Sequence, residues 1–253
     1  MTKLNLKAIR TASRLGHLIV IATGRSIYSA NKVMETLNVE GYILSLNGAV
    51  ILKYNQPVLF SKALPSESLK IMLEMGRKCR AKVSLNTMEK NYQVDFGEHY
   101  NAAIQEYKVG QTPFYMINHE RGLEVISTEA VLKIGCMHKD PNVLKIMQQE
   151  LEQIGLKAVA SDVHYMEMMA DGVSKGKALK KLAEHLNINK ADIIAFGDQE
   201  NDLTMFEAAG TSFAMGNAAE SIKKQASRTT GTNNQSGVGQ AILRMLHEAE
   251  TQT

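Results

Sequence analysis

One short segment of the chain carries several oxygen side chains just after a predicted strand. Asp198 and Asp202 follow a buried strand predicted over 192–196, and Glu200 and Asn201 lie between them. Several oxygen donors in one tight loop suit a hard divalent cation such as Mg²⁺. The alternative is an ordinary helix start, because Asp and Glu favour the first helical turn. We therefore expect Asp198 and Asp202 to hold a metal, with the helix start as the competing interpretation.

Two further features could bind phosphate. Thr23-Gly24-Arg25 follows an apolar strand predicted over 17–22, so the Thr23 hydroxyl and the amides of Gly24 and Arg25 could meet a phosphate oxygen. The alternative is a plain turn that starts a helix. Lys175 lies at the start of a predicted helix, where a lysine and the terminal amides can together neutralise phosphate charge.

These candidates need an α/β scaffold, because ligands of open α/β sheets bind at the carboxyl ends of the strands. Both ends of the chain alternate helix and strand in the way that βαβ units do. The N-terminal part is expected to contain a helix capped by Thr2 and ending near residue 15, strands at 17–22 and 42–45, and a helix at 29–37. The last third is expected to contain helices at 175–186, 200–209, 219–226 and 237–250, and strands at 192–196 and 212–215.

The middle of the chain has a different pattern, with short strands and helices mixed. We expect a hairpin over 50–60, helices at 66–82, near 98–108 and at 141–155, and strands at 83–85, 92–94, 131–137, 158–160 and 165–169. Such mixing predicts an α+β unit with an antiparallel sheet. The simplest organisation is an α/β domain formed by 1–52 and 172–253, interrupted by an α+β domain over 53–171.

Composition excludes several classes of protein. The chain has 253 residues, of which 44% are hydrophobic and 22% charged, as in ordinary globular proteins. The net charge is only +3 and there is no basic run of five residues, so we expect no nucleic-acid partner. No apolar run reaches the ~18–20 residues that span a bilayer, and the N-terminus is too polar for a signal peptide. We expect a cytoplasmic protein without a membrane partner, and the oligomeric state stays open.

Taken together, six short segments resemble the Cof-type branch of the haloacid-dehalogenase-like phosphatases, which carry a class IIB cap. They are 19–25, 46–49, 172–176, 197–202, 215–218 and 236–239. Each segment is weak by itself, but their order and spacing are specific, and the match covers nearly the whole chain. The resemblance implies a Rossmann-like core with an inserted α+β cap and Mg²⁺-dependent hydrolysis of a small phosphorylated metabolite, often a sugar phosphate.

The resemblance also implies a role for each candidate residue. Thr23, with Gly24 and Arg25, would bind the transferring phosphoryl group, and Lys175 would offset its charge. Asp198 would ligate Mg²⁺, and Asp202 would hold either the water shell of the metal or Lys175. Asn201 would support this loop and contribute to phosphate binding, and Asn47 would lie near the phosphate or the junction with the cap. Such a site works by electrostatic stabilisation of the transition state.

One motif of that family is missing from these residues. Its first motif is an apolar strand ending in DxDGT, whose first Asp forms an aspartyl-phosphate and whose second is the general acid and base. Here Thr2 already caps the first helix, and no DxD occurs in the 253 residues. By resemblance, the strand belongs between those ending at Ala22 and Phe196. Its absence would leave backbone groups unpaired, at about 1–3 kcal/mol for each buried one.

Three hypotheses follow from this departure. The first is a phosphatase whose sequence begins late, so that the chain as written is inactive and the intact form is the enzyme. The second is a non-catalytic protein that binds a phosphorylated metabolite without hydrolysing it. The third is that another segment or another chain fills the place of the strand. The retention of Thr23, Lys175, Asp198 and Asp202 favours the first hypothesis, because a long-inactive scaffold need not keep all four.

Overall fold

The computed structural model describes residues 1–96, 105–109 and 112–251, which form two compact units. The first unit consists of Met1–Gly24, Ala30–Phe60 and Ser174–Thr253. The second consists of Arg25–Ser29 and Ser61–Val173. The chain therefore leaves the first unit and returns to it.

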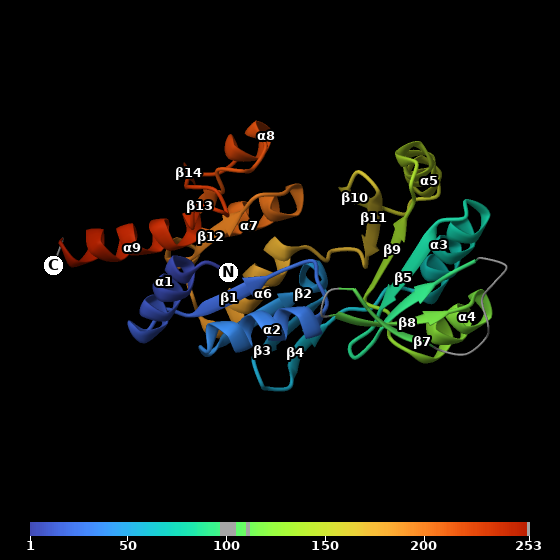
Figure 1. Ribbon diagram of the computed structural model, residues 1–253, viewed down its shortest axis with the longest axis horizontal. Coiled ribbons are helices and arrows are strands. Elements are labelled where there is room, and N and C mark those ends of the chain that lie inside the picture. Colours follow the sequence, from blue (N-terminus) through green and yellow to red (C-terminus); the bar gives the residue numbers. More distant parts are fainter. Residues whose placement is uncertain (97–104, 110–111, 252–253) are drawn as a thin grey trace. The chain divides into compact units, whose positions relative to one another are not determined.

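Both ends of the chain contribute helices and strands to the first unit (Figure 1). The N-terminal part contains α1 (Lys3–Arg14), β1 (Ile19–Ala22), α2 (Ile27–Leu37), β2 (Gly41–Ser45), β3 (Val50–Lys53) and β4 (Val58–Ser61), with a 3₁₀ turn at Leu46–Gly48. The C-terminal part contains α6 (Lys175–Leu186), β12 (Ile194–Gly197), α7 (Leu203–Ala208), β13 (Thr211–Ala214), α8 (Glu220–Lys223), β14 (Arg228–Thr229) and α9 (Gly237–Glu250), with 3₁₀ turns at Lys190–Asp192 and Glu200–Asp202.

The first helix begins where its sequence predicts. The Thr2 side chain accepts a hydrogen bond from the backbone N–H of Asn5 at 3.3 Å, which satisfies one of the orphan amides of the first turn. Ala8 and Ala12 are buried, and α1 packs along α9. Gly16 follows the helix with a φ of +89°, a left-handed conformation that glycine adopts without strain.

The strands of the first unit form two separate sheets over one apolar cluster. β1 pairs in parallel with β2, which continues antiparallel to β3, and the order of this sheet is β1-β2-β3-β4. The other sheet is parallel and has the order β12-β13-β14. Val20 and Ala195 pack into the same cluster as Leu182 of α6, so the two sheets share a core.

No strand pairing joins β1 to β12 within the residues that the structure describes. Each of the two is paired on one edge only, β1 with β2 and β12 with β13. All four residues of β1 are half-buried, and Ile194 of β12 is 45% exposed. These are the strands ending at Ala22 and near Phe196, between which the family resemblance implies a further strand.

In the part of the second unit that the structure describes, a seven-stranded sheet packs against three helices. Its elements are α3 (Ser66–Lys78), β5 (Lys82–Asn86), β6 (Asn91–Val94), β7 (Gln105–Val109), β8 (Thr112–Ile117), α4 (His119–Thr128), β9 (Lys133–Met137), α5 (Pro141–Gln153), β10 (Val159–Asp162) and β11 (Tyr165–Met169). The order is β10-β11-β9-β5-β6-β8-β7, and neighbouring strands in this order are antiparallel except β6 and β8, which are parallel. Alternate strand residues such as Ile134 and Cys136 pack with Met72 and Met147 of the helices.

Two expectations for the middle of the chain differ from the structure, and one helix there was not expected. The helix expected near 98–108 is wrong over 105–108, which belong to strand β7 paired with β8, whereas 97–104 lie outside the described residues. Helix α4 was not expected, although the Asn118 side chain caps it by accepting from the N–H of Arg121. β4 joins the core sheet through its hairpin with β3, so the first unit extends to Phe60 instead of residue 52.

Two other properties of the described residues bear on the interpretation of the sequence. None of the helices in these ranges is long and apolar enough to cross a membrane. Cys79 is half-buried and Cys136 is fully buried, and both are free thiols.

Candidate active site

Four strand ends supply the polar residues of the site in the first unit. Thr23 follows β1, Asn47 lies in the turn after β2, Asp198 follows β12, and Asn217 comes three residues after β13. β1 runs parallel to β2 and β12 runs parallel to β13, so the members of each pair end on the same sheet edge. This is the edge at which ligands bind in open α/β sheets.

Lys175 is the buried cation of the site. It is the first residue of α6, where the Ser174 side chain caps the helix by accepting from the N–H of Lys177 at 3.2 Å. Its Nζ donates to Asp202 Oδ1 at 2.6 Å and to Asn201 Oδ1 at 3.2 Å. Since an ammonium has three N–H donors, these two bonds leave one for a ligand.

The Asp202 carboxylate holds the lysine and shapes its own loop. Oδ1 accepts from Lys175, whereas Oδ2 accepts from the backbone N–H groups of Asp198 at 2.9 Å and Gln199 at 3.0 Å. Gly197 makes room for this arrangement, because a Cβ at that position would lie 2.4 Å from the Cβ of Asp202. Both carboxylate oxygens are thus engaged within the protein.

Asn47 links the first strand end to the Asp198–Asp202 loop. It is buried and adopts a left-handed φ of +57°. Its backbone N–H donates to the carbonyl of Thr23 at 3.0 Å, and its Oδ1 accepts from Asn201 Nδ2 at 3.1 Å. A Cβ on Gly24 would come within 2.8 Å of that same Oδ1, so glycine at this position lets the turn after β1 lie close to the Asn47 side chain.

Asp198 is held by a residue to which the sequence assigned no role. Its Oδ2 accepts from Asn217 Nδ2 at 3.0 Å, and Asn217 Oδ1 accepts from the N–H of Asn233 at 2.9 Å. The signal was available, since Asn217 lies in the 215–218 segment that matches the family pattern. Asp198 Oδ1 takes part in neither of these bonds, which makes it the oxygen best suited to a ligand.

The structure gathers seven of the eight candidates in one unit. They are Thr23, Gly24, Asn47, Lys175, Asp198, Asn201 and Asp202. Arg25 is exposed and begins the 25–29 segment of the second unit, so it is not placed with the others. Within the described ranges, no three His, Cys, Asp or Glu side chains come together in an arrangement that could hold a metal.

Comparison with known proteins agrees with this architecture. A 5-amino-6-(5-phospho-D-ribitylamino)uracil phosphatase of Bacillus subtilis (strain 168) is 28% identical over 239 residues, covering 94% of this chain and 86% of the relative. The structure of a haloacid dehalogenase-like hydrolase from B. subtilis matches with a TM-score of 0.83 at 27% identity, covering 95% of this chain and 92% of that one.

A second solved structure supports the fold only. The subclass IIB sugar phosphatase BT4131 matches with a TM-score of 0.78 at 20% identity, covering 97% of this chain and 92% of that one. The α/β fold and the family predicted from the six sequence segments are confirmed. Residues 1–242 match the family model of the haloacid dehalogenase-like hydrolases, and the chain therefore belongs to that family, whose matched relatives include phosphatases.

Proposed function

We propose that the site binds the phosphoryl group of a small phosphate monoester and supports its Mg²⁺-dependent hydrolysis. The observation that carries this proposal is the buried Lys175 held by Asp202 and Asn201 at a strand-end site. A charge that is fixed before the ligand arrives stabilises the developing charge of phosphoryl transfer without reorganisation. Thr23, with the Gly24 amide, would receive the phosphoryl oxygens beside it, and the Arg25 amide would extend this turn.

The substrate class follows from the relatives. The B. subtilis relative is named for a substrate whose phosphate is carried on a ribityl chain. We propose a phosphate monoester of a sugar or a sugar alcohol for this protein. The residues at the core site recognise the phosphoryl group and carry no feature that distinguishes one such alcohol from another.

The donor set fits one side of a Mg²⁺ site. Mg²⁺ is usually held by one or two carboxylates together with waters and substrate phosphate. Asp198 would be the direct ligand through Oδ1, whereas Asp202 would act through Lys175 and the loop amides, since both of its oxygens are engaged. The ion, when bound, would neutralise charge on the phosphoryl oxygens.

A nucleophile is the part of this chemistry that the described site does not contain. No carboxylate of the site lies in a DxD sequence, and Asp202 is committed to Lys175. We propose that the 253 residues by themselves bind phosphate without hydrolysing phosphate esters. A parallel strand carrying DxDGT and seated between β1 and β12 would supply the attacking carboxylate.

The test is release of phosphate from p-nitrophenyl phosphate with Mg²⁺, by the 253-residue chain and by a form extended with an N-terminal apolar strand ending in DxDGT. We expect turnover only in the extended form, and loss of that turnover on Asp198→Ala or Lys175→Met. Robust turnover by the 253-residue chain that Asp198→Ala abolishes would show that the nucleophile lies within it and would overturn the proposal.

Calorimetric titration with inorganic phosphate separates binding from hydrolysis. We expect the 253-residue chain to bind phosphate, and Thr23→Ala to weaken that binding while circular dichroism stays unchanged. If the folded chain binds neither phosphate nor a sugar phosphate, both the proposed phosphate binding by the 253 residues and the non-catalytic binding alternative are excluded. If it binds sugar phosphates tightly while the extended form remains inactive, that alternative replaces the enzyme.

A further inference from the structure

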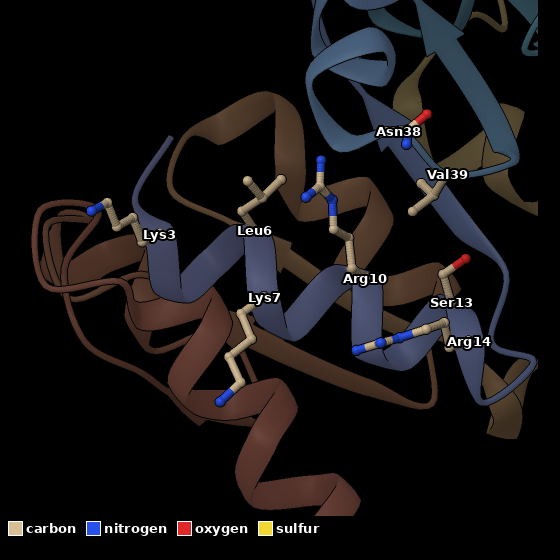
Figure 2. A pocket seen from close by; sticks show the side chains of 8 residues that line it. All are labelled: Lys3, Leu6, Lys7, Arg10, Ser13, Arg14, Asn38 and Val39. Atoms are coloured by element: carbon tan, nitrogen blue, oxygen red, sulfur yellow. The ribbon is translucent and has the colours of Figure 1, made fainter.

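A groove of about 630 Å³ lies along α1 in the first unit (Figure 2). Its lining residues come from α1 and from the segment between α2 and β2, and they are Lys3, Leu6, Lys7, Arg10, Ser13, Arg14, Asn38 and Val39. Four of the eight are cations and none is acidic. None belongs to the candidate active site, and Asn38 and Val39 precede β2, whereas Asn47 follows its end.

The four cations occupy one stripe of the helix. They recur at intervals of four, three and four residues, which places them on the same face. At a rise of 1.5 Å per residue the stripe is about 16 Å long. Figure 2 shows the four side chains leaving α1, with Arg10 reaching toward Asn38.

No carboxylate in the described part of the chain forms an ion pair with any cation of this stripe. Arg10 is held by the end of α2, where its Nε donates to the carbonyl of Leu37 at 2.8 Å. Lys3, Lys7 and Arg14 are exposed, and within the described residues Arg14 is the one of the three whose side chain donates a hydrogen bond, to Thr11 Oγ1. Three cationic heads are thus available to an anion.

Other described helices of the protein contain surface cations that are paired with a glutamate three residues away, whereas those of α1 are not. Ion pairs three residues apart join Lys32 to Glu35, Lys70 to Glu67, Arg77 to Glu74, Arg121 to Glu124 and Lys223 to Glu220. In α1 the neighbours at these spacings are like charges, which destabilise a helix. Lys3 also faces the positive end of the helix dipole, with no acidic residue in the first turn. A bound anion would relieve both effects.

We propose that this groove binds a small anion containing consecutive phosphoryl groups, such as the polyphosphate part of a nucleotide or a free short polyphosphate. The volume lies within the range of small-molecule sites. A stripe of spaced cations suits several linked phosphoryl groups better than one, because each cation meets a separate charge. Leu6 and Val39 are the apolar residues of the groove's lining, and the other six are charged or polar, so the groove offers too little apolar surface to enter a membrane.

The test is calorimetric titration of the 253-residue chain with inorganic tripolyphosphate at low ionic strength. We expect the double variant Lys3→Gln/Lys7→Gln to weaken binding at least tenfold. Arg14→Gln, made separately, should also weaken it. The matched control is Lys139→Gln/Lys157→Gln, which removes the same charge from exposed positions of the second unit. That control should change affinity less than twofold, and all variants should keep their circular dichroism spectra.

Thr23→Ala separates the groove from the candidate active site: it should weaken phosphate binding there, and it should leave unchanged the component of tripolyphosphate binding that Lys3→Gln/Lys7→Gln weakens. Loss of binding in Thr23→Ala would place the ligand at the active site and overturn the proposal. So would absence of binding, or equal weakening by the Lys139/Lys157 control. A comparison of a nucleoside triphosphate with free tripolyphosphate distinguishes the two sources, because the two ligands differ only in the nucleoside. Tighter binding of a single-stranded RNA than of tripolyphosphate would replace the small ligand with nucleic acid and overturn the proposal.

Discussion

Lys175 and Asp202 form an ion pair 2.6 Å long in which both side chains are buried. The pair joins the first turn of α6 to the loop after β12, two parts of the chain that lie 27 residues apart. Asp202 also accepts from two amides of its own loop, so one carboxylate positions a cation and shapes the backbone around it. The site is therefore built before any ligand enters.

Removal of the carboxylate charge from this pair should destabilise the first unit. We expect Asp202→Asn to lower the free energy of unfolding by about 3–5 kcal/mol, since it leaves a buried ammonium without its counter-charge. Urea unfolding followed by circular dichroism measures this change. The exposed pair of Lys32 and Glu35 is the control, and Glu35→Gln should change stability by less than about 1 kcal/mol. A change of similar size in both variants would contradict this account.

Gly176 should not tolerate alanine although it lies in a helix. A Cβ there would come within 1.9 Å of the backbone carbonyl oxygen of Thr204, so the backbone of one element must move. We expect Gly176→Ala to lower the melting temperature and to cost about 1–3 kcal/mol. Gly122 of α4 is the matched control, because its Cβ would meet only side chains, at 3.2 Å and beyond. Gly122→Ala should be near neutral, because the helix preference of alanine over glycine, about 1 kcal/mol, offsets the close side-chain contact.

The second unit contains its own buried ion pair, between Lys133 and Glu167 at 2.7 Å. Glu167→Gln should lower the free energy of unfolding by about 3–5 kcal/mol, whereas Lys133→Met/Glu167→Met should lose much less, because no buried charge is then left unpaired. Denaturant unfolding of both variants beside the wild type measures the difference. If the double variant is as unstable as the single one, the ion pair contributes more free energy to stability than the burial of its two charges costs.

The same pair has a defined pH dependence. Burial lowers the pKa of Lys133, but Tyr165 and Glu167 outweigh it, so this pKa is raised above its ordinary 10.5. A cation whose pKa is raised on folding stabilises the protein below its unfolded pKa, and this stability is lost as the pH rises through the folded pKa. The stability difference between wild type and Lys133→Met/Glu167→Met should thus hold to about pH 10 and shrink above it.

The two thiols should differ in reactivity. Burial raises the pKa of the Cys136 thiol to about 12 and also raises the pKa of Cys79, which is only half-buried. Because the thiolate is the reactive form, we expect a disulfide reagent at pH 8 to modify Cys79 slowly and Cys136 only on unfolding. Cys79→Ser should abolish the slow native phase, and fast labelling of Cys136 in the native protein would contradict this prediction.

The local sequence was sufficient to predict most of the elements that carry the site. Thr2 as a helix cap, the apolar strands before Thr23 and Asp198, and the helix beginning at Lys175 all depend on residues within one turn or one strand. The order of the six motif segments also identified the family, because each segment follows a particular strand or opens a particular helix. These signals are local, so they are present in the chain before it folds.

Tertiary structure decided the features that depend on partners distant in sequence. Strand β7 forms where a helix was expected, because its backbone pairs with that of β8. Helix α4 was not predicted from the sequence because its amphipathic stripe is short. Two features of the site follow from contacts that form only once the loops meet. The carboxylate of Asp202 binds both Lys175 and two loop amides, and Asn217 holds Asp198. Spacing along a chain shows which side chains share a face, whereas the partner of each atom is set by the packing of several elements at once.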